Sequence, residues 1–160
     1  MADGGASEIL MLITGLITAG IAASVLIASW GGIANSIEDS KTQLEADTMT
    51  KASLTSDPMD MSWNQTACNL TIHLQNTGKL VLKNDEIGVI VNGSDTSISN
   101  RRMLTSTNDW IQGNVLELRI CPTGLALNPG DETVLTIIVR SEEYRGVSGT
   151  YAFSEVIRIG

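Results

Sequence analysis

The sequence has little positive charge and few aromatic residues. Ten lysines and arginines stand against eighteen aspartates and glutamates, so the net charge is −8, and only 4% of the residues are aromatic. Binding to nucleic acid requires clustered basic residues and aromatic side chains that stack on bases. This composition therefore gives no indication of a nucleic-acid partner, and we interpret Arg101–Arg102, the one adjacent basic pair, as solvated surface.

The chain is also poor in residues that perform catalysis or bind metals. It has one histidine, His73, and two cysteines, Cys68 and Cys121. It contains no Cys-x-x-Cys pair, no nucleophile motif, no EF-hand loop and no phosphate-binding glycine loop. We therefore expect no enzyme activity, no cofactor and no metal site, and we interpret His73 as an ordinary residue on one face of a strand.

Charge is absent from the whole stretch 9–37. A helix of about 20 apolar residues crosses the roughly 30 Å hydrocarbon core of a bilayer, and it satisfies its own backbone hydrogen bonds there. The stretch predicts a helix that spans a membrane or lies in the core of a filament. It is too long for a signal peptide and no basic region precedes it. The rest of the chain is too polar and strand-rich to bury it as the core helix of a soluble domain.

Small residues and one tryptophan give this helix specific features. Gly15, Ala19 and Ala23 recur at intervals of four residues. Such spacing allows another helix to approach closely. Trp30, near the end of the apolar stretch, suits a bilayer interface. We predict that these positions contact the membrane, other copies of the same chain, or both.

After residue 37 the helical pattern continues but becomes amphipathic, with charged residues flanking an apolar face. This pattern predicts a continuous helix to about Leu54; the alternative is two helices broken at Gly31–Gly32. Asp57–Pro58 then ends the helical register, because the residue before proline favours extended geometry. We place a membrane or filament-core helix with its extension at 1–55 and a second domain at 56–160.

The second domain has the pattern of antiparallel strands. Alternating apolar residues predict strands at 67–75, 86–91, 115–121, 132–139 and 151–159, with a short strand or connection at 79–82. Turn motifs separate them, and 96–109 is expected to be a loop or a weak strand. The fold class is therefore α+β: a long N-terminal hydrophobic α-helix followed by a C-terminal antiparallel β-sandwich.

Two kinds of covalent modification are suggested in this domain. An inter-sheet disulfide between Cys68 and Cys121 is geometrically possible and would contribute about 2–4 kcal/mol; two buried free thiols are the alternative. Asn64, Asn69 and Asn92 each begin an Asn-x-Ser/Thr motif. All three follow the apolar helix, as an exported domain requires, so we regard them as possible N-glycosylation sites.

The order of these elements and several short motifs resemble one protein family. The motifs are the apolar segment 6–27, Ser56-Asp57-Pro58, the LeuGlnAsnThrGly of 74–78 and the LeuAsnProGlyAsp of 127–131. In these the chain resembles the archaellum (archaeal flagellum) accessory proteins called FlaG and FlaF, which are related to archaellins and type IV-like pilins. The resemblance covers almost the whole chain and rests on the layout more than on any single motif.

The resemblance implies a structural protein of the cell envelope without an ATPase of its own. The helix would be a single-span membrane anchor with the N-terminus inside. The β-sandwich would lie outside, where it binds the S-layer or other archaellum proteins as a stator of the rotary motor. Lys41 and Lys51 follow the helix on the side that we place outside, which runs against the usual excess of basic residues inside.

Two other functions compete with this one. An archaellin or pilin-like filament subunit would polymerise through its N-terminal helix. The long continuous helix favours this function, whereas the absence of lysine and arginine from residues 1–8 disfavours it, because filament precursors carry a basic leader. An exported ligand-binding module on a single anchor would need a polar cleft, and no convergent set of polar residues predicts one.

Overall fold

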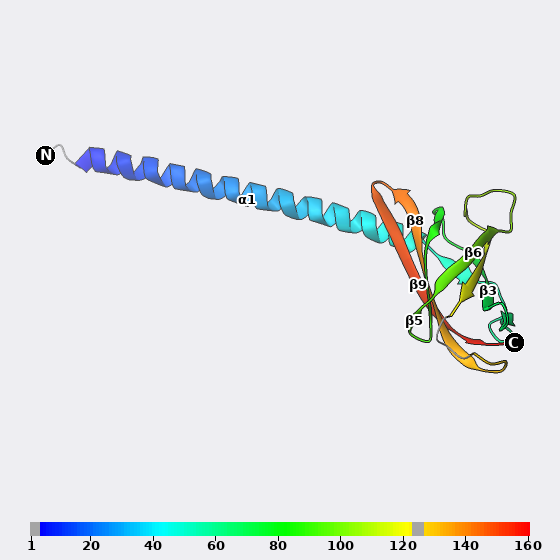
Figure 1. Cartoon of the computed structure of the whole chain (residues 1–160). Helices are drawn as coiled ribbons and strands as arrows, with labels where there is room; N and C mark the ends of the chain where they lie inside the picture. Colours follow the sequence, from blue (N-terminus) through cyan, green and yellow to red (C-terminus); the bar gives the residue numbers. More distant parts are fainter. Residues whose placement is uncertain (1–3, 123–126) are drawn as a thin grey trace. The chain divides into compact units, whose positions relative to one another are not determined.

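The computed structural model describes residues 4–122 and 127–160. Its one helix, α1, runs unbroken from Gly4 to Met49 (Figure 1). Its 46 residues extend over about 69 Å at 1.5 Å per residue. Gly31 and Gly32 lie inside it, so the alternative of two helices is wrong.

The helix ends earlier than its periodicity predicted. Thr50 closes it, with its N–H 3.0 Å and its hydroxyl 2.7 Å from the carbonyl oxygen of Ala46. Shortly after it, Ala52–Leu54 form strand β1 and pair with strand β3 (Asn69–Asn76). Helical spacing in 50–54 is overridden by this pairing with residues 20 to 24 positions away, which no local pattern can reveal.

The strands form two antiparallel sheets. The first has the order β1-β3-β7-β6, with β2 also paired to β3. Its remaining strands are β2 (Trp63–Asn64), β3 (Asn69–Asn76), β6 (Ser97–Met103) and β7 (Val115–Cys121). The second sheet has the order β5-β4-β8-β9. Its strands are β4 (Leu82–Val91), β5 (Ser94–Asp95), β8 (Glu132–Tyr144) and β9 (Val147–Arg158).

One hydrophobic core joins the two sheets. Alternate residues of each central strand are buried, such as Leu70 and Ile72 of β3 and Leu118 of β7. They belong to the same cluster as Val89 of β4 and Ile137 of β8. Side chains from two packed sheets form this kind of core in a sandwich. The predicted α+β class, with an N-terminal helix and an antiparallel β-sandwich, is confirmed.

Each of the five strands expected from alternation is present, and the differences lie in length and number. β8 and β9 are longer than predicted because they form a hairpin over Arg145–Gly146, whose φ angles are 52° and 82°. Two positive φ angles define the tight turn that best matches the twist of paired strands. β6 occupies part of the expected loop or weak strand, and the short strands β1, β2 and β5 were not predicted.

The two cysteines form a disulfide with a Cα–Cα distance of 5.1 Å. Cys68 immediately precedes β3 and Cys121 ends β7, and these strands are neighbours in one sheet, with Leu70 paired to Ile120. The bridge therefore links adjacent strands, and the expected inter-sheet geometry is wrong. Face alternation could not distinguish the two cases, because Cys68 lies outside the strand with φ of 48°.

By contacts the chain divides into a unit that ends at Lys41 and a unit from Thr42 to Gly160. The last two turns of α1 therefore belong to the same compact unit as the strands.

Candidate functional site

Most of the exposed large apolar side chains of the described chain lie on α1. Leu16 is 72% exposed, Val25 58% and Trp30 70%. No residue in the most apolar part of the helix is buried, and by length and composition the helix can cross a membrane. An apolar surface of this size requires lipid or another protein to cover it.

Hydroxyl side chains within and just after the apolar stretch 9–37 are bonded inside the helix. Six hydroxyl groups donate to backbone carbonyls three or four residues earlier, for example Thr18 to Thr14 at 2.9 Å and Ser29 to Val25 at 2.9 Å. The others are Thr14, Ser24, Ser36 and Ser40. Hydroxyls bonded in this way need no water. The helix surface is therefore compatible with an apolar environment despite its serines and threonines.

The small residues predicted to pack against lipid or another helix are open. Ala19 and Ala23 are exposed, and a side chain placed on Gly15 would meet nothing within 4 Å. These positions lie on one side of the helix because residues four apart are neighbours on its surface. Their role, like that of Trp30, stays a prediction.

The last turns of α1 pack against the β8–β9 hairpin. Gln43 donates through Nε2 to the carbonyl of Ser148 at 3.0 Å. The backbone N–H of Thr150 donates to Asp47 Oδ1 at 2.8 Å. Ala46, between the two polar contacts, is fully buried. The helix end is thus held to β9 by side-chain and backbone groups together.

Gly149 permits this close packing. A Cβ atom at this position would collide with the Ala46 carbonyl of α1 and with the hydroxyl of Thr50, which follows the helix. The N–H of Gly149 donates to the hydroxyl of Ser141 in β8 at 2.8 Å, which joins the two strands of the hairpin at this point. Sequence reasoning missed this position, because a glycine within a strand indicates close approach without saying what approaches.

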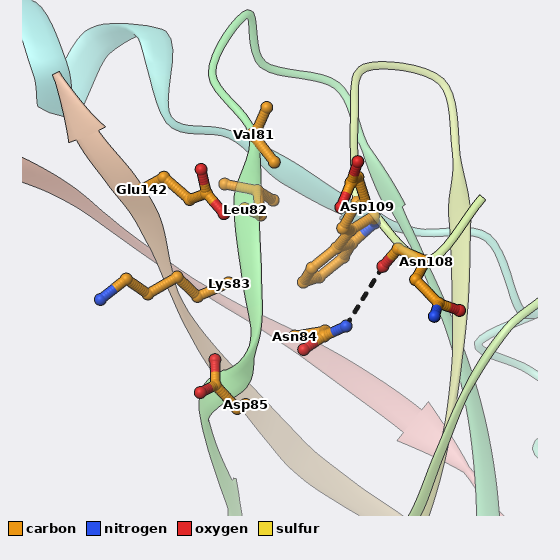
Figure 2. A pocket seen from close by; sticks show the side chains of 9 residues that line it. Val81, Leu82, Lys83, Asn84, Asp85, Asn108, Asp109 and Glu142 are labelled. Carbon is orange, nitrogen blue, oxygen red and sulfur yellow. Dashed lines mark hydrogen bonds between the residues drawn. The ribbon is translucent and has the colours of Figure 1, made fainter.

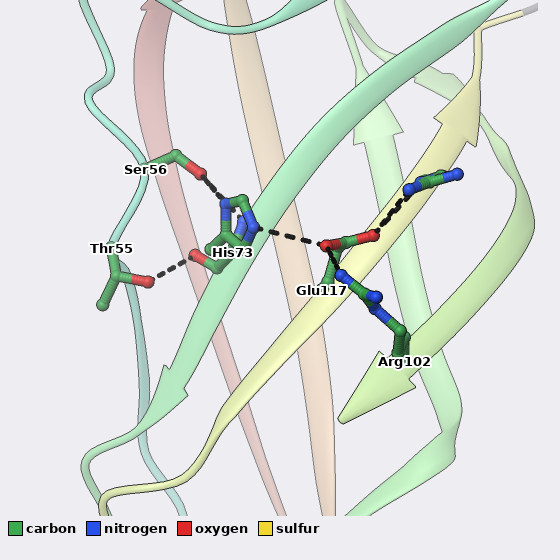
Figure 3. Close-up of polar contacts among 6 residues, drawn as sticks. Thr55, Ser56, His73, Arg102 and Glu117 are labelled. Carbon is green, nitrogen blue, oxygen red and sulfur yellow. Dashed lines mark hydrogen bonds and ion pairs between the residues drawn. The ribbon is translucent and has the colours of Figure 1, made fainter. Parts of the chain in front are cut away.

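A charged cluster lies on the outer face of the first sheet (Figure 3). Glu117 of β7, with a side chain only 9% exposed, accepts from Arg102 Nη2 at 2.9 Å and from Arg119 Nε at 3.1 Å. His73 Nε2 lies 3.7 Å from the same carboxylate. Ser56 bonds the other ring nitrogen of His73 at 3.2 Å and accepts from its backbone N–H at 2.8 Å.

Opposing effects set the pKa of Glu117. Burial raises it, but the hydrogen bond and charge of Arg102, followed by those of Arg119, outweigh burial and hold the pKa below the ordinary glutamate value. The Glu117 carboxylate is therefore ionised at neutral pH, and the cluster links three adjacent strands. It was not predicted as a unit, because its members come from separate segments, although His73 does lie on the outer face of a strand.

A further candidate functional site is a pocket of about 210 Å³ at the start of β4 (Figure 2). Trp110, 1% exposed, forms one wall, and Asn84 Nδ2 donates to the Asn108 carbonyl at 3.3 Å. Asp85, Asp109 and Glu142 also line it. Among the described residues there is no group of three or more histidine, cysteine, aspartate or glutamate side chains placed to hold a metal ion. The described residues that line it include no serine, threonine, cysteine or histidine.

The three possible glycosylation sites lie at the surface. Asn64 and Asn92 are exposed, and Asn69 is half-buried at the start of β3. The Asn64 side-chain oxygen accepts from the Ala67 N–H at 3.0 Å. Asn92 occupies the β4–β5 turn with φ of 50°. Surface position is a requirement for glycosylation, and modification of these residues stays a prediction.

Comparison with known proteins places this architecture in a family. A family model described as archaeal-type flagellin matches residues 2–153. The chain belongs to the archaeal-type flagellin family. A relative from Methanocaldococcus jannaschii, described as flagella-related protein G, is 30% identical over 122 residues, which cover 74% of this chain and 79% of the relative. No solved structure matches the chain. The resemblance to archaellum proteins is confirmed.

Proposed function

We propose that this protein is a membrane-anchored stator subunit of the archaellum. The apolar part of α1 spans the membrane once with its N-terminus inside, and the β-sandwich lies outside and binds the S-layer. The observation that carries the anchor is the exposed surface of residues 9–37, which has no charge and whose hydroxyls are bonded within the helix. The name of the relative, flagella-related protein G, supports an accessory role.

A filament subunit is the second candidate. The family model that matches the chain is described as a flagellin. In a filament, the side of α1 with Gly15, Ala19 and Ala23 would pack against other copies of the chain rather than against lipid.

A larger side chain on this side of α1 separates the two candidates. In a lipid anchor, Ala19→Leu adds apolar surface and leaves both membrane attachment and motility unchanged. In a filament, the same change fills space needed for helix packing and stops assembly. Ala28→Leu is the matched control, since nine residues at about 100° each place it on the opposite side of the helix. Swimming assays and envelope fractionation of both strains provide the measurement.

S-layer binding is tested separately by chemical cross-linking of intact cells followed by purification of the chain. A cross-link between the β-sandwich and the S-layer protein supports the stator. Cross-links to other archaellum proteins alone would leave the anchor in place but contradict the S-layer contact.

A further inference from the structure

Strand β9 forms one edge of the second sheet, and the two ends of its free edge are covered. At one end the Thr150 N–H donates to Asp47 Oδ1 at 2.8 Å. At the other end the Arg158 N–H donates to the Pro58 carbonyl at 2.7 Å, and the Arg158 carbonyl accepts from the Met61 N–H at 2.9 Å. Both residues therefore direct their backbone groups away from β8.

The middle of this edge is uncovered. In an antiparallel ladder, alternate residues direct both N–H and C=O to the same side. Ala152, Ser154 and Val156 have the same parity as Thr150 and Arg158, so their backbone groups also point away from β8. Within the described chain, β8 is the only strand that pairs with this part of β9. All three residues are exposed.

The other edges have features that prevent pairing. β1, β2 and β5 have three residues or fewer. β6 carries Arg101 and Arg102 and a register shift between Ile98 and Asn100. The outer edge of β4 carries Asp85 and Glu86 and a shift of its own. Short strands, charges and bulges block edge-to-edge association.

The uncovered edge is neither short nor bulged. The stretch Ala152–Val156 pairs with β8 without a shift and contains no lysine or proline. Its one charged residue, Glu155, alternates with the three outward residues and directs its backbone towards β8. Val156 is 59% exposed, and so is its cross-strand neighbour Val134, at 44%. An apolar pair beside an unpaired edge is a suitable surface for another strand.

We infer that this edge pairs with β9 of a second copy of the chain, antiparallel and centred on Ser154. In this register Ser154 lies opposite its counterpart, and Ala152 lies opposite Val156. All three outward residues of both copies are then paired by about six backbone hydrogen bonds, because each such residue pair exchanges two. A shift of two residues in either direction would place an outward residue against the covered positions 150 or 158.

The charge and symmetry of the edge support a second copy as the occupant. The side chains on the outer face of the stretch are uncharged and small enough to lie beside their counterparts. An antiparallel pair of identical strands has twofold symmetry, so one interface satisfies both edges and closes. This interface involves β9 alone and does not depend on whether α1 contacts lipid or other helices.

Cysteine cross-linking of the full-length chain in native membranes tests the register. Opposed residues in a hydrogen-bonded pair have Cα atoms about 5.5 Å apart, within the range that a disulfide bridges. Ser154→Cys is therefore expected to form a reducible dimer under mild oxidation. The native cysteines do not compete, because they are joined to each other. Thr136→Cys is the control. Thr136 pairs with Ser154 but lies one strand further in, so two copies would be roughly 15 Å apart and stay monomeric.

Absence of a dimer of Ser154→Cys would overturn the proposal, as would equal dimer formation by both variants or cross-linking of Ser154→Cys only to a different protein. A second substitution examines the backbone pairing itself. Ala152→Pro removes an N–H that points away from β8, so it is tolerated at an edge. Combined with Ser154→Cys, it is expected to abolish the dimer; an undiminished dimer would contradict the pairing.

Discussion

The carboxylate of Glu117 is nearly buried. It is held by charged partners from its own strand and from a neighbouring strand. Its side chain is 9% exposed and contacts Arg102 and Arg119, which are 62% and 45% exposed. Removal of the carboxylate leaves two arginines that water can solvate. The free-energy cost of this removal is therefore the loss of charged hydrogen bonds. It does not include the larger cost of leaving two buried charges without partners.

We predict that Glu117→Gln lowers the free energy of unfolding by about 1–2 kcal/mol at neutral pH. Because the folded-state pKa of Glu117 is depressed, its contribution is complete above the ordinary glutamate pKa of about 4.3 and is lost as the pH falls through the folded value. The difference between wild type and variant should therefore shrink on acidification. Denaturant unfolding of the detergent-solubilised protein at several pH values measures it.

Glu143→Gln provides the matched control, because Glu143 is exposed on β8. Its effect should stay within about 0.5 kcal/mol at every pH. A difference for Glu117→Gln that is constant or grows towards low pH would contradict the account of the cluster.

For single residues, the sequence revealed which residue types are present but not which other residues they contact. The outward position of His73 follows from alternation in one strand. The cluster around Glu117 needs the register of β3, β7 and β6, which depends on how distant segments pair. The role of Gly149 was equally unpredictable, since the residues that it contacts, Ala46 and Thr50, lie about 100 positions earlier in the chain.

Among the elements, β3 and β7 are joined both by backbone pairing and by the Cys68–Cys121 disulfide, which closes a separation of 53 residues. A cross-link of this kind restricts the unfolded chain. We predict that replacing both cysteines by serine lowers the free energy of unfolding by about 2–4 kcal/mol. Reduction of the wild type should cause a similar loss and leave the variant unchanged; equal stability of wild type and variant would refute the prediction.

The contact between the end of α1 and β9 depends on Gly149. We predict that Gly149→Ala costs about 1–3 kcal/mol, because the added Cβ atom meets backbone of α1 that cannot move like a flexible side chain. Thermal unfolding of the β-sandwich, followed by circular dichroism, measures the loss. Gly31→Ala is the control, since a Cβ atom at Gly31 meets nothing within 4 Å. Equal effects of both substitutions would show that the packing at Gly149 is not special.

The elements themselves were largely predictable, because apolar periodicity is a local property. The uncharged stretch predicted α1, and alternation predicted the five main strands. The end of α1 was placed too late, at about Leu54 instead of Met49, because β1 forms only through pairing with β3. The inter-sheet disulfide was wrong for the same reason: strand order is not contained in the pattern of single strands.

For the whole molecule, we propose that α1 holds the protein in the membrane while the β-sandwich lies outside it. The long apolar surface of α1 fits lipid and also fits a filament core, and the family contains flagellins. Composition and periodicity indicate that α1 needs an apolar environment. They do not identify the molecules that provide this environment.

The most direct test is to shear native cells, separate filaments from envelopes, and determine by mass spectrometry and electron microscopy where the full-length chain is found. The account predicts that the chain stays with the membrane and S-layer fraction and is absent from the sheared filaments. Filaments built from this chain, with α1 in their core, would contradict it and identify the protein as a filament subunit.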